Sequence, residues 1–213
     1  MKNFLAIDTA SEYLSVVAVV DGNTYSRYLP DCAMRHSTAL MTEIDGLLKE
    51  HALSLADFHF FACVVGAGSF TGIRIGLATV KGLALATGKP TLPITSFDVM
   101  AYNGVDGERK KTLCLVDALH GNYYAAGYDG HGCVLFPCYL DEGQVNALRD
   151  DGYRLRAHRA LPLIGVEDIE IVSPVTGLEL AVKTLSEDRE NFGELTALYV
   201  RKSSAELNLE NNK

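Results

Sequence analysis

The feature that most constrains the fold of this chain is a glycine-rich turn between a predicted strand and a predicted helix. The turn reads Gly66-Ala67-Gly68-Ser69-Phe70-Thr71-Gly72 and follows an apolar, β-prone segment at residues 58–65. A helix pattern continues through Thr87 and ends at Gly88 and Pro90, as helix C-termini commonly do. A strand, a glycine turn and a helix start direct backbone N–H groups toward an anion or toward a partner's backbone. The sequence therefore predicts an α/β unit whose turn faces a ligand or a partner.

One order of elements occurs twice along the chain. The first copy has predicted strands at 4–8, 14–20 and 24–29, a helix at 34–50, the strand at 58–65, the helix at 72–87, a strand at 92–95 and a helix capped by Ser96. The second has strands at 112–117, 123–128 and 133–139, a helix capped by Asp141, a strand at 169–172 and a helix beginning at Ser173-Pro174. Turn residues at 103–107 separate the copies. We therefore predict two subdomains, 1–104 and 105–213, with the second copy abbreviated.

Further motifs accompany the glycine turn in a fixed order. They are Ile7-Asp8-Thr9 after the first strand, Arg35-His36-Ser37 at the helix start, and Leu198-Tyr199-Val200-Arg201 followed by Ala205-Glu206. With the glycine turn, they make the chain resemble the TsaB (YeaZ) family, although Ala67 stands where that family usually has proline. The resemblance implies an α/β fold of the duplicated actin-like, Hsp70-like ATPase type (ribonuclease H-like).

The same resemblance implies a function without catalysis. The chain is expected to bind and activate TsaD, within the complex that transfers a threonylcarbamoyl group to the adenosine beside the anticodon of tRNA. The ATPase TsaE is expected to join the pair, the chain to form a homodimer when alone, and tRNA to be reached only through the complex. No catalytic residue, metal or intrinsic cofactor is expected, and any ATP or ADP is expected at the junction with TsaD and TsaE.

The helix at 72–87 is apolar on nearly every side and is kept thin by glycine and alanine. An interior glycine costs a helix about 0.5–1 kcal/mol relative to alanine, so close packing should offset the loss. Either the chain's own sheet or a partner can supply that packing, and the resemblance favours a partner that contacts this helix and the helix at 34–50. The candidate contact residues are His36, Leu40, Ser69, Phe70, Thr71, Gly72, Arg74, Ile75, Gly76 and Lys81.

The main alternative to a non-catalytic partner of TsaD is a protein that binds ATP on its own, and the sequence argues against it. Phosphates need glycine turns for close approach of the backbone. The first strand is followed by Thr9-Ala10-Ser11-Glu12 and the strand at 112–117 by Ala118-Leu119-His120, and the chain has no Gly-Gly pair. Asp8 and Thr9 remain the only weak candidates for a nucleotide contact.

A metal site and a peptidase site have little support. His36 has Leu40 at the fourth position, where a second histidine would be needed to share one ion on a helix. Ser69 lies between Ala67 and Thr71, so the Gly-x-Ser-x-Gly nucleophile motif is missing. Ser69 and Thr71 are instead expected to cap the helix that follows.

Charge and composition bear on whether the chain itself binds RNA and on where in the cell it is found. The net charge is −8, and no dense basic cluster is present that would release counterions from RNA phosphates. Arg109-Lys110-Lys111 is predicted to be a solvated loop and the basic stretch 154–159 an exposed strand edge. Five cysteines without a Cys-x-x-Cys pair, no apolar run of membrane length and a start too short for a secretory segment favour a cytoplasmic protein.

Overall fold

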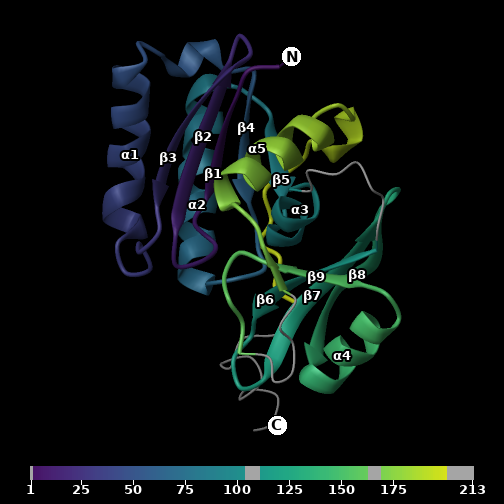
Figure 1. Cartoon of the computed structure of the whole chain (residues 1–213). Helices are drawn as coiled ribbons and strands as arrows, with labels where there is room; N and C mark the ends of the chain where they lie inside the picture. The colour runs from purple at the N-terminus through teal and green to yellow at the C-terminus, as the bar shows by residue number, and fades with distance from the viewer. Residues whose placement is uncertain (1, 104–110, 163–168, 201–213) are drawn as a thin grey trace, which may run out of the picture.

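The computed structural model describes residues 2–103, 111–162 and 169–200, and it contains two five-stranded sheets, each in its own lobe (Figure 1). The first sheet has the order β3-β2-β1-β4-β5 and the second the order β10-β9-β6-β7-β8. The first lobe comprises β1 (Phe4–Asp8), β2 (Leu14–Val20), β3 (Asn23–Leu29), α1 (His36–Glu50), β4 (Phe60–Val64), α2 (Phe70–Thr87), β5 (Thr91–Ile94) and α3 (Ser96–Ala101). The rest comprises β6 (Thr112–Asp117), β7 (Asn122–Asp129), β8 (Gly132–Asp141), α4 (Glu142–Asp150), β9 (Arg154–Ala157), β10 (Ile169–Ile171) and α5 (Pro174–Leu185), with 3-10 turns at Leu55–Asp57 and Arg189–Asn191.

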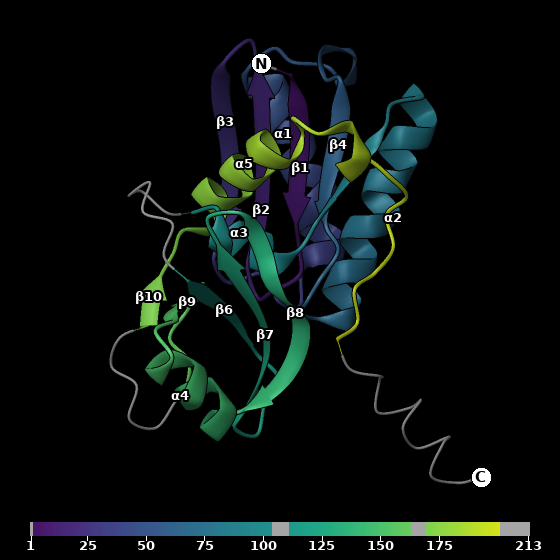
Figure 2. The same cartoon turned by 90° about the vertical axis from the view of Figure 1, so that its right-hand side faces the viewer.

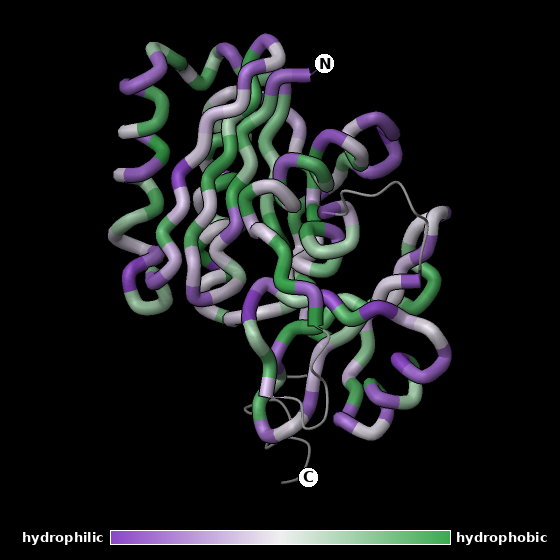
Figure 3. Tube along the Cα trace, viewed as in Figure 1, coloured by the Kyte–Doolittle hydropathy of each residue, from purple (hydrophilic) through white to green (hydrophobic). Residues whose placement is uncertain are grey.

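Three strands at the centre of the first sheet are buried on both faces. β1 pairs antiparallel with β2 and parallel with β4, and every residue of these three strands is buried. The hairpin between β2 and β3 turns at Asp21 and Gly22, which both have positive φ, as a tight two-residue hairpin requires. Figure 3 shows the hydrophobic residues gathered along these central strands. This sheet is therefore the rigid support for the helices on either side.

Helices cover both faces of the first sheet. α1 and α2 pack on one face and α5 on the other, while α3 packs against α5 and against β6, β7 and β9 of the second sheet (Figures 1 and 2). α5 comes from the second half of the sequence, yet Leu178, Ala181 and Val182 belong to the core of the first lobe. The predicted subdomain boundary between residues 104 and 105 lies outside the described residues. None of the described helices is both long and apolar enough to cross a membrane.

The predicted order of elements is confirmed, with two local corrections. Thr95, not Ser96, is the N-cap of α3, because its hydroxyl accepts from the Asp98 N–H while the Asp98 carboxylate accepts from the Thr95 N–H. Residues 154–157 form an interior strand and not a sheet edge, since β9 is paired with β6 and β10. The predicted loop at 109–111 and the motif residues beyond Val200 fall largely or wholly outside the described residues.

Candidate functional site

The glycine turn is held by hydrogen bonds within the chain. The Ser69 N–H donates to the Ala10 carbonyl over 2.7 Å, and the Ser69 hydroxyl accepts from the Gly72 N–H over 3.2 Å, which caps α2. A Cβ at Gly68 would lie 2.0 Å from the Ala10 carbonyl oxygen, so a side chain has no room there. Thr71 lies inside the helix, so the prediction that it shares the capping role is wrong. The turn is therefore locked to the segment that follows β1.

The thin inner side of α2 packs on Thr9, directly after β1, and on Cys63 of β4. A Cβ at Gly72 would lie 2.0 Å from the Thr9 carbonyl oxygen, and one at Gly76 would lie 2.5 Å from Thr9 Oγ1 and 3.3 Å from Cys63 Sγ. The Thr9 hydroxyl donates to the Gly72 carbonyl over 2.7 Å. These two glycines let the helix approach its own sheet, so a bulky residue at Gly76 would test the fold and not a partner surface.

The outer side of α2 consists mainly of small and apolar residues, and Arg74 and Lys81 are its two charged residues. We call this surface the outer α2 face and define it by its exposed residues, which are Thr71, Arg74, Ala78, Lys81, Gly82, Leu85 and Ala86. Leu85 is 88% exposed, and a Cβ at Gly82 would have nothing within 4 Å. The neighbouring helix α1 contacts α2 and exposes Met41 to 51%. The exposed apolar side chains on these helices are therefore Leu85 with the alanines of the outer α2 face and Met41 of α1, whose other exposed residues are polar or charged.

The ten candidate contact residues separate into inner and outer groups. His36, Leu40, Gly72 and Gly76 are buried, whereas Ser69, Thr71, Arg74 and Lys81 are exposed and Phe70 and Ile75 are half-buried. The two ring nitrogens of His36 lie 2.9 Å from the Tyr13 carbonyl oxygen and 3.2 Å from the Ala33 carbonyl oxygen. His36 therefore ties the start of α1 to neighbouring segments.

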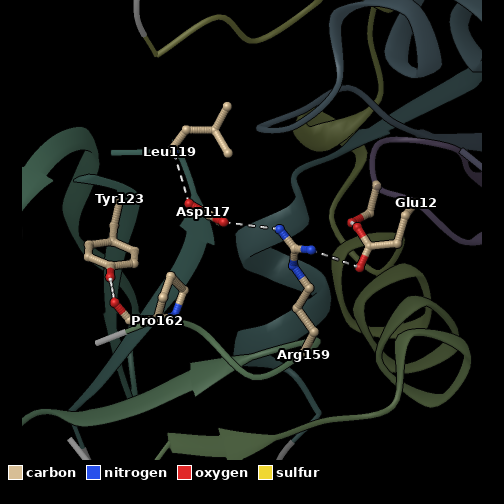
Figure 4. A network of polar contacts seen from close by, with 7 residues as sticks. Glu12, Asp117, Leu119, Tyr123, Arg159 and Pro162 are labelled. Carbon is tan, nitrogen blue, oxygen red and sulfur yellow. Dashed lines mark hydrogen bonds and ion pairs between the residues drawn. The ribbon is translucent and has the colours of Figure 1, made fainter. Parts of the chain in front are cut away.

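A cleft of about 190 Å³ opens between the lobes. It is lined by the segment after β1, the glycine turn, the end of β6 and residues 157–161. The Arg159 guanidinium lies across it, 3.1 Å from the Asp117 carboxylate and 3.5 Å from the Glu12 carboxylate, so an ion pair joins the two lobes (Figure 4). The pair is half exposed, so its free energy is small.

Buried polar groups lie behind the cleft residues Ala10 and His158. The Asp8 carboxylate accepts from the Ala10 N–H and from the Tyr13 hydroxyl, each over 2.9 Å. Burial raises the pKa of Asp8 despite these two hydrogen bonds, and burial together with Asp8 raises the pKa of Tyr13. The His158 ring packs edge-on against Tyr13, and burial lowers the pKa of His158 to about 4. The His158 Nε2 atom is buried and makes no hydrogen bond to the described residues.

The cleft residues do not fit the phosphates of a nucleotide. Two N–H groups that follow these strands are already used, since Ala10 donates to Asp8 and Leu119 donates to Asp117. Arg159 is engaged by two carboxylates, so the cleft has no uncommitted positive charge among its described lining residues. Nor do the described residues include a cluster of three or more His, Cys, Asp or Glu side chains that could hold a metal.

Comparison with known proteins identifies the family. The family model described as TsaD, tRNA N6-adenosine threonylcarbamoyltransferase, matches residues 24–135, which is more than half of the chain. The tRNA threonylcarbamoyladenosine biosynthesis protein TsaB of Escherichia coli is 34% identical over 129 residues, covering 58% of this chain and 54% of that protein. The TsaB of Bacillus subtilis is 24% identical over 210 residues, covering 95% and 89%. The chain belongs to the TsaB (YeaZ) family.

Solved structures agree with this family on the fold. YeaZ from Pseudomonas aeruginosa superposes with a TM-score of 0.70 at 20% identity, covering 93% of this chain and all of that chain. The predicted duplicated actin-like, ribonuclease H-like ATPase fold is therefore confirmed. The chain spans about half the length of the first curated TsaB relatives that it matches, from Escherichia coli and Haemophilus influenzae.

The sequence interpretation missed two features of this region. Tyr199 stacks on Phe70 at the start of α2, and Arg159 joins the lobes. The contacting residues in each case are far apart in the sequence, so no local spacing signals them. The Tyr199 motif was visible as a family segment, but its contact with α2 was not.

Proposed function

We propose that this chain is a non-catalytic subunit in the synthesis of threonylcarbamoyladenosine in tRNA, and that it binds and activates TsaD through α1 and the outer α2 face. The names of its TsaB relatives support the pathway. The main observation in favour of the outer α2 face as the TsaD contact is the exposure of Leu85. This side chain is 88% exposed and lies beside the open position Gly82. Exposed apolar surface on a folded domain commonly marks a site of protein association.

Gly82 gives a second reason to place a partner on the outer α2 face. A glycine inside a helix costs about 1 kcal/mol relative to alanine. The inner glycines offset that cost by close packing on Thr9 and Cys63, but nothing in the described chain approaches Gly82. A partner helix that packs closely against the outer α2 face would supply the missing compensation.

The family match also suggests the kind of partner. The TsaD family model aligns with residues 24–135, which include α1 and α2. A TsaD partner is thus expected to have equivalent helices, and one helix pair would pack on the other. We extend the proposal to a homodimer through the same helices when TsaD is absent, to TsaE as a third member, to tRNA contact through the complex only, and to a cytoplasmic location.

The transfer chemistry belongs to TsaD in this proposal. The Glu12 and Asp117 carboxylates of the cleft are paired with Arg159, and the Ala10 and Leu119 N–H groups donate to carboxylates of the same chain. An autonomous ATPase or phosphotransferase is the alternative. Micromolar binding of magnesium and ATP to the isolated chain in calorimetry would favour that alternative.

Complementation tests the pathway directly. The gene for this chain is expressed in bacteria depleted of their own TsaB, and nucleosides from their tRNA are quantified by mass spectrometry. We expect threonylcarbamoyladenosine to return with the wild-type chain and with the cleft variant Arg159→Gln. Failure of the stably folded wild-type chain to restore the nucleoside would contradict the proposal.

A further inference from the structure

The end of the described chain forms a clamp on α2. The rings of Phe70 and Tyr199 stack with centroids 4.4 Å apart and planes inclined by 14°. Arg74 Nε donates to the Tyr199 hydroxyl over 3.1 Å, and the guanidinium carbon lies 5.9 Å from the centroid of each ring. Tyr199 is 39% exposed and Arg74 is exposed, so the clamp faces solvent. Two aromatic rings and one hydroxyl thus fix the direction of the arginine.

The segment that carries Tyr199 is itself anchored. Residues 192–200 run along α2 (Figure 2). The Gly193 N–H donates to the Thr91 carbonyl over 3.0 Å, and the Leu198 N–H donates to the Val65 carbonyl over 2.7 Å. These bonds fix the segment to β5 and to the end of β4, so Tyr199 has a defined position.

The two cations of the outer α2 face differ in their pairing. Lys81 lies 3.6 Å from the Glu194 carboxylate of the same anchored segment. No carboxylate among the described residues forms an ion pair with Arg74. The segment therefore pairs with one cation and orients the other, and no described residue accepts a hydrogen bond from the terminal nitrogens of Arg74.

We infer that the Phe70–Arg74–Tyr199 clamp binds a carboxylate side chain of the protein that packs on the outer α2 face. This inference rests on the proposed function, and it identifies the chemistry that the partner brings to that surface. A guanidinium fork and a carboxylate can form two parallel hydrogen bonds, and prior orientation of the fork reduces the ordering cost of binding. Arg74 is the residue that binds the carboxylate, and Tyr199 is a positioning residue.

A protein carboxylate fits this site better than an RNA phosphate. RNA binding draws on several cations acting together, whereas the clamp offers one, and the chain carries a net charge of −8. A single oriented guanidinium beside apolar residues resembles the arginine and tyrosine anchors of protein interfaces.

The test is the affinity of the full chain for its cognate TsaD, measured by calorimetry at low and at high salt. We expect Arg74→Gln to weaken binding by about tenfold and to flatten its salt dependence. Tyr199→Phe keeps the stack but loses the hydroxyl, so it should weaken binding by about threefold with an unchanged melting temperature. Lys111→Gln is the matched control, because it removes a similar exposed and paired charge from the second lobe, away from α1 and the outer α2 face, and we expect a change below about twofold.

The outcomes separate the two proposals. If the wild-type chain does not bind TsaD, the proposed function fails. If it binds and Arg74→Gln has the same dissociation constant and salt dependence, the clamp inference is overturned while the function stands. If Arg74→Gln instead reduces retention of tRNA by the lone chain and leaves TsaD binding unchanged, the acceptor is a phosphate and the carboxylate inference is wrong.

Discussion

Two glycines of one helix should respond oppositely to the same substitution. Gly72 and Gly82 both lie in α2, but they face different surroundings. A Cβ at Gly72 would lie 2.0 Å from the backbone oxygen of Thr9, whereas a Cβ at Gly82 would have nothing within 4 Å. We therefore predict that Gly72→Ala destabilises the chain and Gly82→Ala stabilises it.

The magnitudes follow from the contacts. Real Cβ atoms essentially never come closer than 3.0 Å to such an atom, so α2 would have to move by about 1 Å away from a backbone that cannot yield. That shift disturbs the packing of Ile73 and Leu77 and the hydrogen bond from Thr9, and we expect a net loss of about 3 kcal/mol or more. Gly82→Ala should gain about 0.5–1 kcal/mol from helix propensity alone.

Urea and thermal unfolding of the two variants provide the assay. For a chain of this size, about 1 kcal/mol shifts the melting temperature by about 2–4 °C. Gly72→Ala should thus melt at least about 6 °C lower and Gly82→Ala a few degrees higher. Equal shifts, or a Gly72→Ala variant as stable as wild type, would refute the proposed close approach of α2 to Thr9.

Two further predictions concern the polar groups of the cleft. Tyr13→Phe removes a hydrogen bond to the buried Asp8 carboxylate, which should cost about 1–3 kcal/mol. The raised pKa of Asp8 means that the chain loses stability as the pH rises and Asp8 ionises. The Tyr13 hydroxyl stabilises the ionised carboxylate, so urea unfolding should show a larger cost of Tyr13→Phe at about pH 8 than at about pH 4, and an equal cost would contradict this. His158 has a lowered pKa of about 4, so its neutral form stabilises the chain above the ordinary pKa of histidine, and about 2 kcal/mol is lost between about pH 7.5 and about pH 5. His158→Gln should show a flatter loss over this range, and an unchanged slope of stability against pH would rule out the neutral buried ring.

Local signals in the sequence predicted much of the fold. The Ser69 cap, the Asp141 cap and the Ser173-Pro174 helix start are each set by residues within a few positions, and the structure confirms them. The packing of α5 on the first sheet has no such signal. It depends on contacts between segments far apart in the chain.

The candidate surface could be predicted only in part. α2 has small residues on two sides, and its sequence does not say which side meets its own sheet. The structure shows that Gly72 and Gly76 face inward and that Gly82 faces outward. The Arg74 clamp also needs Tyr199, which lies 125 positions further along the chain.

The most direct test of the proposed partner surface is the affinity of the chain for TsaD after one charge is placed on the outer α2 face. Ala78→Glu adds a carboxylate at an exposed position of α2, and Ala147→Glu adds the same group at an exposed position of α4 in the other lobe. Calorimetry should show tight binding by wild type and by Ala147→Glu, and binding weaker by about a hundredfold or more for Ala78→Glu, because the new carboxylate would occupy Arg74 one turn away and its bulk would hold a partner helix away from this face. Equal affinities for all three chains would contradict the assignment of this surface to TsaD.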